Sequence, residues 1–192
     1  MPRPNLIPTS MRLLVISDDD FQAGQLEAVP VDVLVSCGAL QDATIVRAME
    51  RYRPRQVFAV RGNHDVEQPF PPGVVDLHLA RKTFEGLRFG GFAGSWKYKP
   101  RGYHLFEQAE VSGIMRGFPE VDIFVAHNSP RGIHERDGDV HQGFDGFVSY
   151  LDRARPRLFI HGHQHLDITT VRGETTIVGV FGERVIQVEP GP

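Results

Sequence analysis

The chain has 192 residues, of which 41% are hydrophobic and 23% are charged, and its formal net charge is −3. This length allows one well-buried core but is short for two, and the negative charge argues against a protein that binds nucleic acid mainly by electrostatic attraction. No apolar stretch approaches the roughly 20 residues of a membrane helix, and the single cysteine, Cys37, excludes an intrachain disulfide and disfavours a thiolate zinc site.

The first ten residues contain three prolines and lack the apolar block of a signal peptide. We therefore expect a disordered or loosely attached arm over residues 1–10 and a single domain over residues 11–192. Without a targeting segment, the default location is the cytoplasm.

Strands and helices are predicted to alternate in the first part of the chain. Short apolar runs that end in polar residues indicate strands at 12–17, 31–36 and 56–60. Helices are expected at 21–29 and 42–52. The second helix is predicted to have Asp42 as its N-cap and Ile45, Val46 and Met49 on one face. This order predicts a sheet with a parallel core and helices packed on it.

The rest of the chain continues the pattern and then ends in strands alone. Strands are expected at 74–80, 87–92, 121–126 and 157–160, and helices at 106–118 and 143–153. The tail, with strands at 167–171, 175–180 and 184–188, is typical of an antiparallel meander that turns at Gly173 and Gly182. Together these elements predict an α/β fold of two sheets face to face with helices outside.

Polar clusters follow four of the predicted strands, and one of them holds three of the nine histidines within five residues. The clusters are Asp18-Asp19-Asp20, Gly62-Asn63-His64-Asp65, Ala126-His127-Asn128 and the stretch His161-Gly162-His163-Gln164-His165. Carboxylate and amide oxygens together with imidazole nitrogens suit Mn²⁺, Fe or Zn²⁺ better than Ca²⁺ or Mg²⁺ alone. The candidate metal ligands are therefore Asp18, Asp20, Asn63, His127, His163 and His165. His64, which would point elsewhere than Asn63, is the candidate general acid.

Each cluster also has a structural interpretation. Gly-Asn-His-Asp alone is an ordinary turn sequence, the three aspartates suit the start of a following helix, and a lone histidine after a strand is more often structural. Their joint occurrence at four strand ends favours a metal site.

The order Asp18, Gly38, Gly62-Asn63-His64-Asp65, His127 and Gly162-His163-Gln164-His165 resembles the calcineurin-like metallophosphoesterase superfamily, in particular its small bacterial members. The resemblance runs from about Arg12 to the end of the chain. It implies a four-layer αββα sandwich and up to two divalent ions that activate water. It further implies that Asp18 and His165 bind one ion, that Asn63, His127 and His163 bind the other, and that His64 protonates the leaving group.

Two positions depart from the family pattern. Asp20 stands where a histidine is usual, and Ala39 follows Gly38 where the family has the aspartate that bridges the two ions. Three accounts of Ala39 stay open. Asp20 substitutes in part, the site holds one ion or none with weak or lost activity, or the alanine is an engineered change.

Two loops are candidates for substrate contact. The segment 96–104 interleaves basic and aromatic residues, so Lys97, Lys99 and Arg101 could neutralise phosphate while the aromatic rings stack on a base, although such rings often simply pack on the sheet edge. The long loop 130–142 could form a rim over the site or be plain surface.

The sequence thus predicts a metal-dependent phosphoesterase, with a phosphodiester as the expected bond and Mn²⁺ as the first choice of metal. The expected partner is a small phosphoester, with a nucleotide-like compound as one candidate. Nucleic acid is a further candidate that the net charge disfavours, a membrane is not expected, and the oligomeric state is open. The alternative is a binding or scaffold protein that kept the fold and lost the chemistry, as the retromer subunit with this fold has done. A nuclease is a third, weaker hypothesis.

Overall fold

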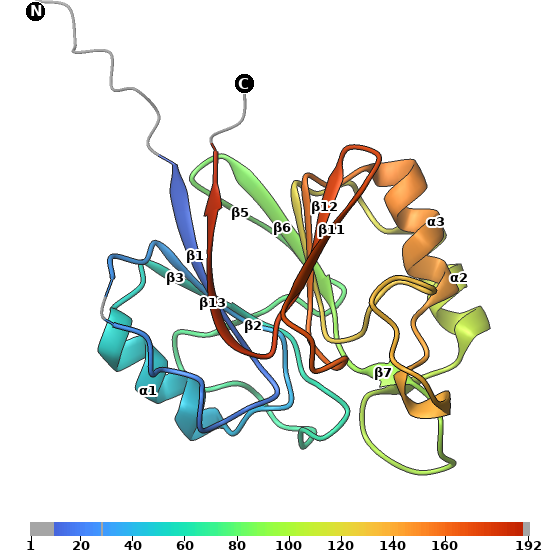
Figure 1. Ribbon diagram of the computed structural model, residues 1–192, viewed down its shortest axis with the longest axis horizontal. Helices are drawn as coiled ribbons and strands as arrows, with labels where there is room; N and C mark the ends of the chain where they lie inside the picture. Colours follow the sequence, from blue (N-terminus) through green and yellow to red (C-terminus); the bar gives the residue numbers. More distant parts are fainter. Residues whose placement is uncertain (1–9, 28, 190–192) are drawn as a thin grey trace, which may run out of the picture.

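The computed structural model describes residues 10–27 and 29–189. They form two β-sheets that lie face to face (Figure 1). Helix α1 (Asp42–Tyr52) covers the outer face of one sheet, and α2 (Gln108–Gly117) and α3 (Asp145–Ala154) cover the outer face of the other. The four-layer αββα arrangement implied by the resemblance is therefore confirmed.

The first sheet has the order β13-β1-β2-β3-β4. Its strands are β1 (Met11–Ser17), β2 (Val33–Ser36), β3 (Gln56–Ala59), β4 (Val75–Asp76) and β13 (Gly182–Val188). Strands β1 to β4 are parallel, and β13 pairs antiparallel with β1, from Met11 opposite Val188 to Ser17 opposite Gly182.

The second sheet has the order β11-β12-β10-β9-β6-β5. Its strands are β5 (Arg81–Phe84), β6 (Leu87–Phe92), β9 (Ile123–Ala126), β10 (Leu158–His161), β11 (Ile168–Arg172) and β12 (Thr175–Gly179). The four inner strands are parallel, while the edge strands β5 and β11 are antiparallel to their neighbours. A separate pair, β7 (Ser95–Trp96) with β8 (Leu105–Phe106), and a 3₁₀ helix η1 (Asp139–His141) complete the elements.

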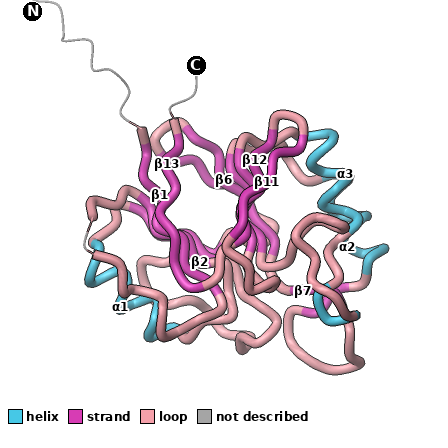
Figure 2. The backbone as a smooth tube through the Cα atoms, viewed as in Figure 1, coloured by secondary structure: helices cyan, strands magenta, loops and turns pink. Residues whose placement is uncertain are grey.

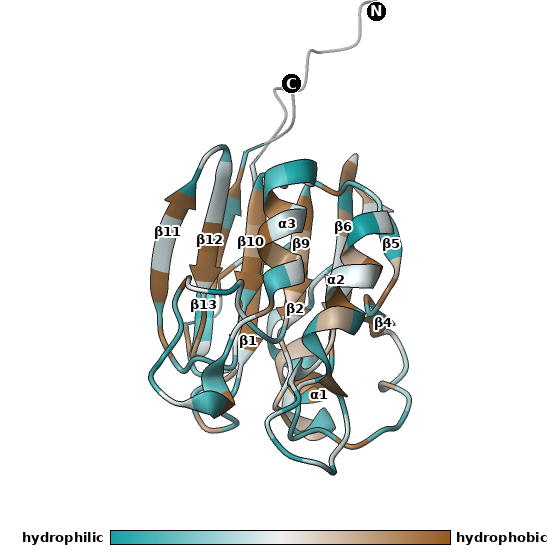
Figure 3. Ribbon diagram, turned by 90° about the vertical axis from the view of Figure 1, so that its right-hand side faces the viewer, coloured by the Kyte–Doolittle hydropathy of each residue, from teal (hydrophilic) through white to brown (hydrophobic). Residues whose placement is uncertain are grey.

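Side-chain alternation along the inner strands explains the layers. Strand residues such as Val15, Phe58 and Val125 face the other sheet and form the central core. Their sequence neighbours face outward. Leu14 packs under α1 in a second core cluster, and Phe124 packs under α2 and α3 in a third. Strands buried on both faces are apolar throughout, as the hydropathy colouring of Figure 3 shows for β9 and β10.

Loops gather at the end of the molecule opposite the described chain ends (Figure 2). The loops that leave β1, β2, β3, β9 and β10 lie there, because these strands run in the same direction within their sheets. All four polar clusters found in the sequence follow β1, β3, β9 or β10. The fold therefore places them on one edge of the sandwich.

Three predicted elements were wrong. Residues 21–27 form turns instead of part of a helix, and Phe21 is 89% exposed. Carboxylates hold these turns: Asp19 accepts the N–H of Phe21, and Glu183 accepts the N–H groups of Gly24 and Gln25. The strand expected at 74–80 shortens to the two residues of β4.

The tail is not a three-stranded meander, because β13 leaves the hairpin β11–β12 and joins the other sheet beside β1.

Helix α1 has the predicted bounds but a different cap and a shifted buried face. Gln41 is the N-cap, and Asp42 is the first helical residue. The buried residues are Thr44, Ile45, Ala48 and Tyr52, so Val46 does not belong to the buried face. The proposed N-terminal arm lies outside the described residues apart from Ser10. Within residues 10–27 and 29–189, no helix combines the length and the apolar character needed to cross a membrane.

Candidate metal centre

The strongest pair in the cluster joins His127, after β9, to Asn63, after β3. Nε2 of His127 lies 2.8 Å from Oδ1 of Asn63, and Nδ1 lies 2.7 Å from the carbonyl oxygen of Cys37. Both partners are hydrogen-bond acceptors. A neutral imidazole has one N–H, so it can satisfy only one of them.

His127 is neutral in the folded protein because complete burial lowers its pKa to about 3. When its N–H donates to Cys37, a lone pair on Nε2 faces a lone pair on Asn63. A cation bound by both atoms would remove this conflict. In the absence of a cation, the amide of Asn63 can turn over and donate to Nε2.

Tyr98 is the second hydrogen-bond partner of the Asn63 amide. Nδ2 of Asn63 lies 3.1 Å from the Tyr98 hydroxyl and donates to it. The sequence pattern did not single out Tyr98, although it lies within the basic and aromatic loop. The neighbouring charged residues attracted attention instead, and the hydroxyl contact depends on the loop conformation.

A second pair joins the ends of β1 and β10. The Asp18 side chain is 2% exposed, and its Oδ1 lies 3.7 Å from Nε2 of His165. Its Oδ2 accepts from the Ser17 hydroxyl at 2.5 Å and from the backbone N–H of His163 at 2.8 Å. Burial raises the pKa of Asp18 to about 6, which is the response of a carboxylate that lacks a neighbouring cation.

His163 lies between the two pairs, with its ring centroid 5.0 Å from that of His127. Its Nε2–H donates to the carbonyl of Val140 at 3.0 Å. This bond leaves the lone pair on Nδ1, so a metal ligand role would use that atom. Burial lowers the pKa of His163 to about 3, which keeps the ring neutral.

The loop from Pro130 to Gln142 forms the rim that the sequence suggested. Gln164 donates to the carbonyl of His141 at 2.8 Å, and Asn128 donates to the carbonyl of Gln142 at 2.8 Å. The ring of His141 lies 5.5 Å from the ring of His163. The hydrogen bond from Gln164 therefore holds this loop next to the candidate ligands. The position of Gln164 between two histidines in the sequence did not predict this role.

The candidate centre includes four of the ten described residues other than glycine that have a positive φ angle. Four residues of the cluster have left-handed backbone angles, which side chains other than glycine rarely adopt: Asp18 (φ 62°), Ala39 (φ 54°), His163 (φ 62°) and His165 (φ 50°). Each costs of the order of 1–2 kcal/mol. Strain of this kind is retained where the surrounding structure imposes it, and it is common at functional sites.

Ala39 lies in a turn built for close approach. Gly38 (φ 91°) precedes it, and a Cβ on Gly38 would collide with the backbone of Gly62. Asp65 ties the two loops together, because its carboxylate accepts the N–H groups of Ala39 and Gly62 at 3.0 and 2.7 Å. The turn is therefore rigid. Aspartate adopts the left-handed backbone angles found at position 39 more readily than alanine does.

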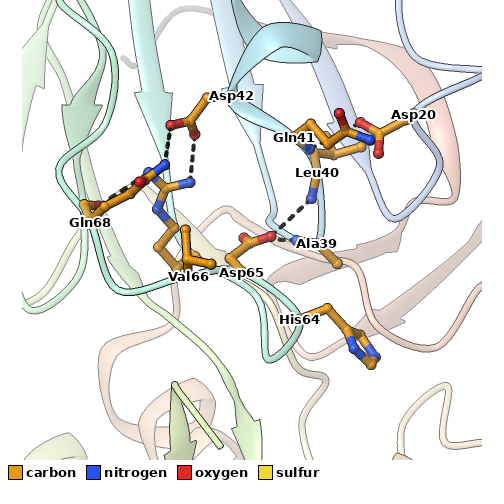
Figure 4. Close-up of a pocket in the computed structure, with 10 residues that line it drawn as sticks. Asp20, Ala39, Leu40, Gln41, Asp42, His64, Asp65, Val66 and Gln68 are labelled. Carbon is orange, nitrogen blue, oxygen red and sulfur yellow. Dashed lines mark hydrogen bonds and ion pairs between the residues drawn. The ribbon is translucent and has the colours of Figure 1, made fainter.

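Asp20 is held apart from the other candidate ligands. Its Oδ1 accepts the N–H of Gln41 at 3.0 Å and the hydroxyl of Thr44 at 2.5 Å, which ties it to the start of α1. The structural interpretation of the aspartate run, as the start of a helix directly after it, is not met, because residues 21–27 form no helix. The assignment of Asp20 as a metal ligand stays a prediction that this arrangement does not favour. His64 is exposed and lies near Ala39 (Figure 4).

The basic loop is only partly available for substrate. Lys97 forms an ion pair with Glu107 at 3.0 Å, and Lys99 lies over the ring of Tyr98 at 5.1 Å. Arg101 is exposed. The roles of Lys97, Lys99 and Arg101 in substrate binding stay predictions.

Within the described residues, no three His, Cys, Asp or Glu side chains already converge on one point. The candidate ligands instead form the two pairs described above, with His163 between them. The donor set nevertheless fits divalent cations. It combines one carboxylate, one amide oxygen and three imidazoles, and Asn63 and His127 present an oxygen and a nitrogen 2.8 Å apart.

Residues 11–191 match the family profile of the calcineurin-like phosphoesterase superfamily domain. The chain is a member of the calcineurin-like phosphoesterase superfamily. The match covers nearly the whole chain and confirms the resemblance seen in the strand-end motifs.

Solved structures of this fold include two that match over almost their full length. Phosphopantetheinyl hydrolase (PptH) from Mycobacterium tuberculosis is 13% identical, with a TM-score of 0.63 over 97% of this chain and 98% of that one. The protein TT1561 of Thermus thermophilus is 12% identical, with a TM-score of 0.60 over 94% and 99%. At these identities the likeness supports the fold alone. No curated protein matches the chain in sequence.

Proposed function

We propose that this calcineurin-like phosphoesterase hydrolyses a phosphoester, with a phosphodiester as the expected bond, by a mechanism that depends on divalent cations. The observation that carries the proposal is the contact between His127 and Asn63. Nε2 of His127 and Oδ1 of Asn63 lie 2.8 Å apart in a buried site that keeps the imidazole neutral, and both are acceptors when the ring N–H donates to Cys37. A cation is the ligand that such a pair would bind.

The proposed ligands divide as the family resemblance implies. Asn63, His127 and His163 would hold one ion, and Asp18 and His165 would hold the other. Bound divalent cations, with Mn²⁺ as first choice and Fe or Zn²⁺ as alternatives, would neutralise the phosphate charge and lower the pKa of the attacking water. Carbonyl groups of Cys37 and Val140 would orient His127 and His163 toward them.

His64 is proposed as the general acid. It follows Asn63 directly, but it is exposed, whereas Asn63 is buried, so the two side chains are in different environments. An imidazole at the edge of the site can deliver a proton to the oxygen of the departing alcohol. It needs no contact with the cations to do so.

Ala39 is expected to weaken the site without abolishing it. The residue cannot supply a carboxylate between two cations, so their mutual repulsion is less compensated. Asn63, His127 and His163 do not depend on that carboxylate. We expect one ion to be held more tightly than the other.

The test is hydrolysis of bis(p-nitrophenyl) phosphate with and without Mn²⁺. Activity should require the metal, and His64→Ala should lower kcat by about 10²–10⁴-fold while leaving bound metal unchanged. Asp152→Asn, which alters an exposed residue on α3 outside the cluster, serves as the control. The proposal would be contradicted if Ala39→Asp protein with metal bound cleaved no phosphoester.

A non-catalytic binding role is the second candidate, and Ala39 is the observation that favours it. A scaffold has no physical need for the neutral, oriented histidines or for a strained backbone at His163 and His165. Metal that binds without any hydrolysis, even in Ala39→Asp, would support this second role.

A further inference from the structure

A pocket of about 370 Å³ lies beside the candidate centre. It is bounded by the loop after β2, the first residue of α1 and the loop after β3 (Figure 4). Ala39 and His64 line one side, and Asp20 and Gln41 line the opposite side. The sequence motifs supply Asp20, His64 and Asp65 to its lining, whereas they gave no indication that Gln41 and Val66 would join them.

The pocket carries a negative charge. Three carboxylates, Asp20, Asp42 and Asp65, line it against one guanidinium, Arg61, which leaves a formal charge of −2. Arg61 is 5% exposed, is paired with Asp42 at 2.7 Å and lies 3.8 Å from the centre of the Phe70 ring. Its charge is therefore already compensated and offers little to an anion.

The remaining polar groups include hydrogen-bonding positions that are not fully used. In the described part of the chain, only Oδ1 of the Asp20 carboxylate is hydrogen-bonded, which leaves Oδ2 as an acceptor. Nε of Arg61 is buried without a partner among the described residues. The Gln41 side chain lies next to Asp20 (Figure 4), and Leu40 and Val66 add apolar wall.

The position of His64 determines which part of a substrate would enter the pocket. A general acid protonates the oxygen of the leaving alcohol. The body of that alcohol must then extend from His64 to the side on which space is available. The pocket begins at His64 and Ala39 and leads away to Asp20 and Gln41.

Building on the proposed function, we propose that this pocket binds the leaving alcohol of the substrate and selects an amino alcohol. An ammonium group would face the free oxygen of Asp20, and its short carbon chain would lie on Leu40 and Val66. A neutral alcohol would bind less well, and an alcohol with a carboxylate would be rejected by the like charge of the walls.

The first experiment measures binding without relying on catalysis. Zn²⁺-loaded protein, which is diamagnetic, is titrated with ethanolamine, glycerol or glycerate and followed by ¹H–¹⁵N NMR. Ethanolamine should shift the amides of Leu40, Gln41 and Val66, with a half-saturating concentration roughly tenfold below that of glycerate. Equal binding of the two, or shifts confined to other residues, would overturn the proposal.

Two substitutions test the charge argument from opposite directions. Asp20→Asn keeps an oxygen for the Gln41 N–H but removes the charge, so the preference for ethanolamine should fall to roughly threefold. Gln41→Lys adds a charge on an exposed side chain and should reverse the preference toward glycerate. Asp152→Asn, the same chemical change on α3, should leave the preference unchanged.

The second experiment compares kcat/KM for the methyl phosphodiesters of ethanolamine, glycerol and glycerate with the Mn²⁺-loaded enzyme. We expect kcat/KM to fall in that order. In Asp20→Asn, the differences between the three values should become smaller while the metal content stays unchanged. A metal content that falls in Asp20→Asn would assign Asp20 to the metal site and overturn its role in the pocket. If no phosphoester is hydrolysed, the proposed function fails, while the NMR titration still decides whether the pocket selects amino alcohols.

Discussion

At the scale of single residues, the orientation of one amide connects the loop after β7 to the candidate centre. The Tyr98 hydroxyl accepts from Nδ2 of Asn63, which leaves Oδ1 facing Nε2 of His127. A carboxamide in this orientation presents its oxygen to a cation. The Tyr98 hydroxyl can donate as well as accept, so it anchors the amide, and a bound cation would select the orientation with Oδ1 toward His127.

We therefore expect Tyr98→Phe to weaken Mn²⁺ binding about tenfold, because a group that orients a metal ligand is lost while the aromatic ring stays. Isothermal titration with MnCl₂ measures the change. Tyr103→Phe, at a residue that is 54% exposed, is the matched control and should have no effect. Unchanged affinity in Tyr98→Phe would show that the hydroxyl does not orient Asn63.

Three buried histidines make the metal-stripped protein sensitive to acid. Burial lowers the pKa of His127, His161 and His163 to about 3 each, below the ordinary value of 6.5. The unfolded chain therefore takes up these protons first, and stability that is present above pH 6.5 is lost as the pH falls toward 3. Asp18 opposes this in part, because burial raises its pKa to about 6, so the folded state takes up its proton first.

We expect the free energy of unfolding of the metal-stripped protein to fall by about 3 kcal/mol between about pH 7 and pH 5.5. Urea denaturation at the two pH values measures this difference. A stability that is constant or rises over this interval would mean that the histidines are not buried in neutral form.

At the scale of elements, aromatic packing fixes α3 against the second sheet. Phe147 on α3 is fully buried, and its ring lies 5.1 Å from Phe144, 5.6 Å from Phe124 and 5.4 Å from Phe159. Strands β9 and β10 carry two of these partners, and they also lead directly into the candidate ligands. Packing under α3 therefore supports the strands that position His127 and His163.

Phe147→Ala should lower the free energy of unfolding by about 3–5 kcal/mol, because it removes a large buried ring and leaves a cavity. Val171→Ala on β11, at a residue that is 67% exposed, should change it by less than about 0.5 kcal/mol. Thermal or urea denaturation compares the two. Equal effects would contradict the packing described here.

Some helices and strands could be predicted from the sequence pattern alone. Strand β6 and helix α1 have the bounds that their apolar patterns predict, because periodicity within a segment decides them. The turns at residues 21–27 depend on Glu183, and the sheet that β13 joins depends on β1, both far away in sequence. Contacts between residues so far apart in the sequence cannot be predicted from the pattern of residues within one segment.

The candidate centre divides in the same way. The strand-end motifs predict which residues lie near one another, and the structure brings Asn63 to His127 and Asp18 to His165. Among the described residues, no hydrogen bond joins the Asp20 carboxylate to them, since it bonds to Gln41 and Thr44 at the start of α1. The contacts of Tyr98 and Gln164 could not be predicted, because loop conformations decide them.

At the scale of the whole molecule, two sheets of different connectivity place their parallel strand ends on one edge. Each sheet contributes part of the candidate ligand set, with Asp18 and Asn63 from the first and His127, His163 and His165 from the second. The site therefore exists only when both sheets are packed face to face. Metal binding should stabilise the sandwich as a unit, because unfolding either sheet separates the ligands.

The central claim is that these strand ends hold divalent cations, and the metal content of the protein tests it most directly. The measurement is equilibrium dialysis against saturating MnCl₂, followed by metal analysis, for the protein and for Ala39→Asp. We predict one tightly held ion in the protein and two in Ala39→Asp, since the added carboxylate would lie between the two positions. Absence of bound metal from both proteins would contradict the account.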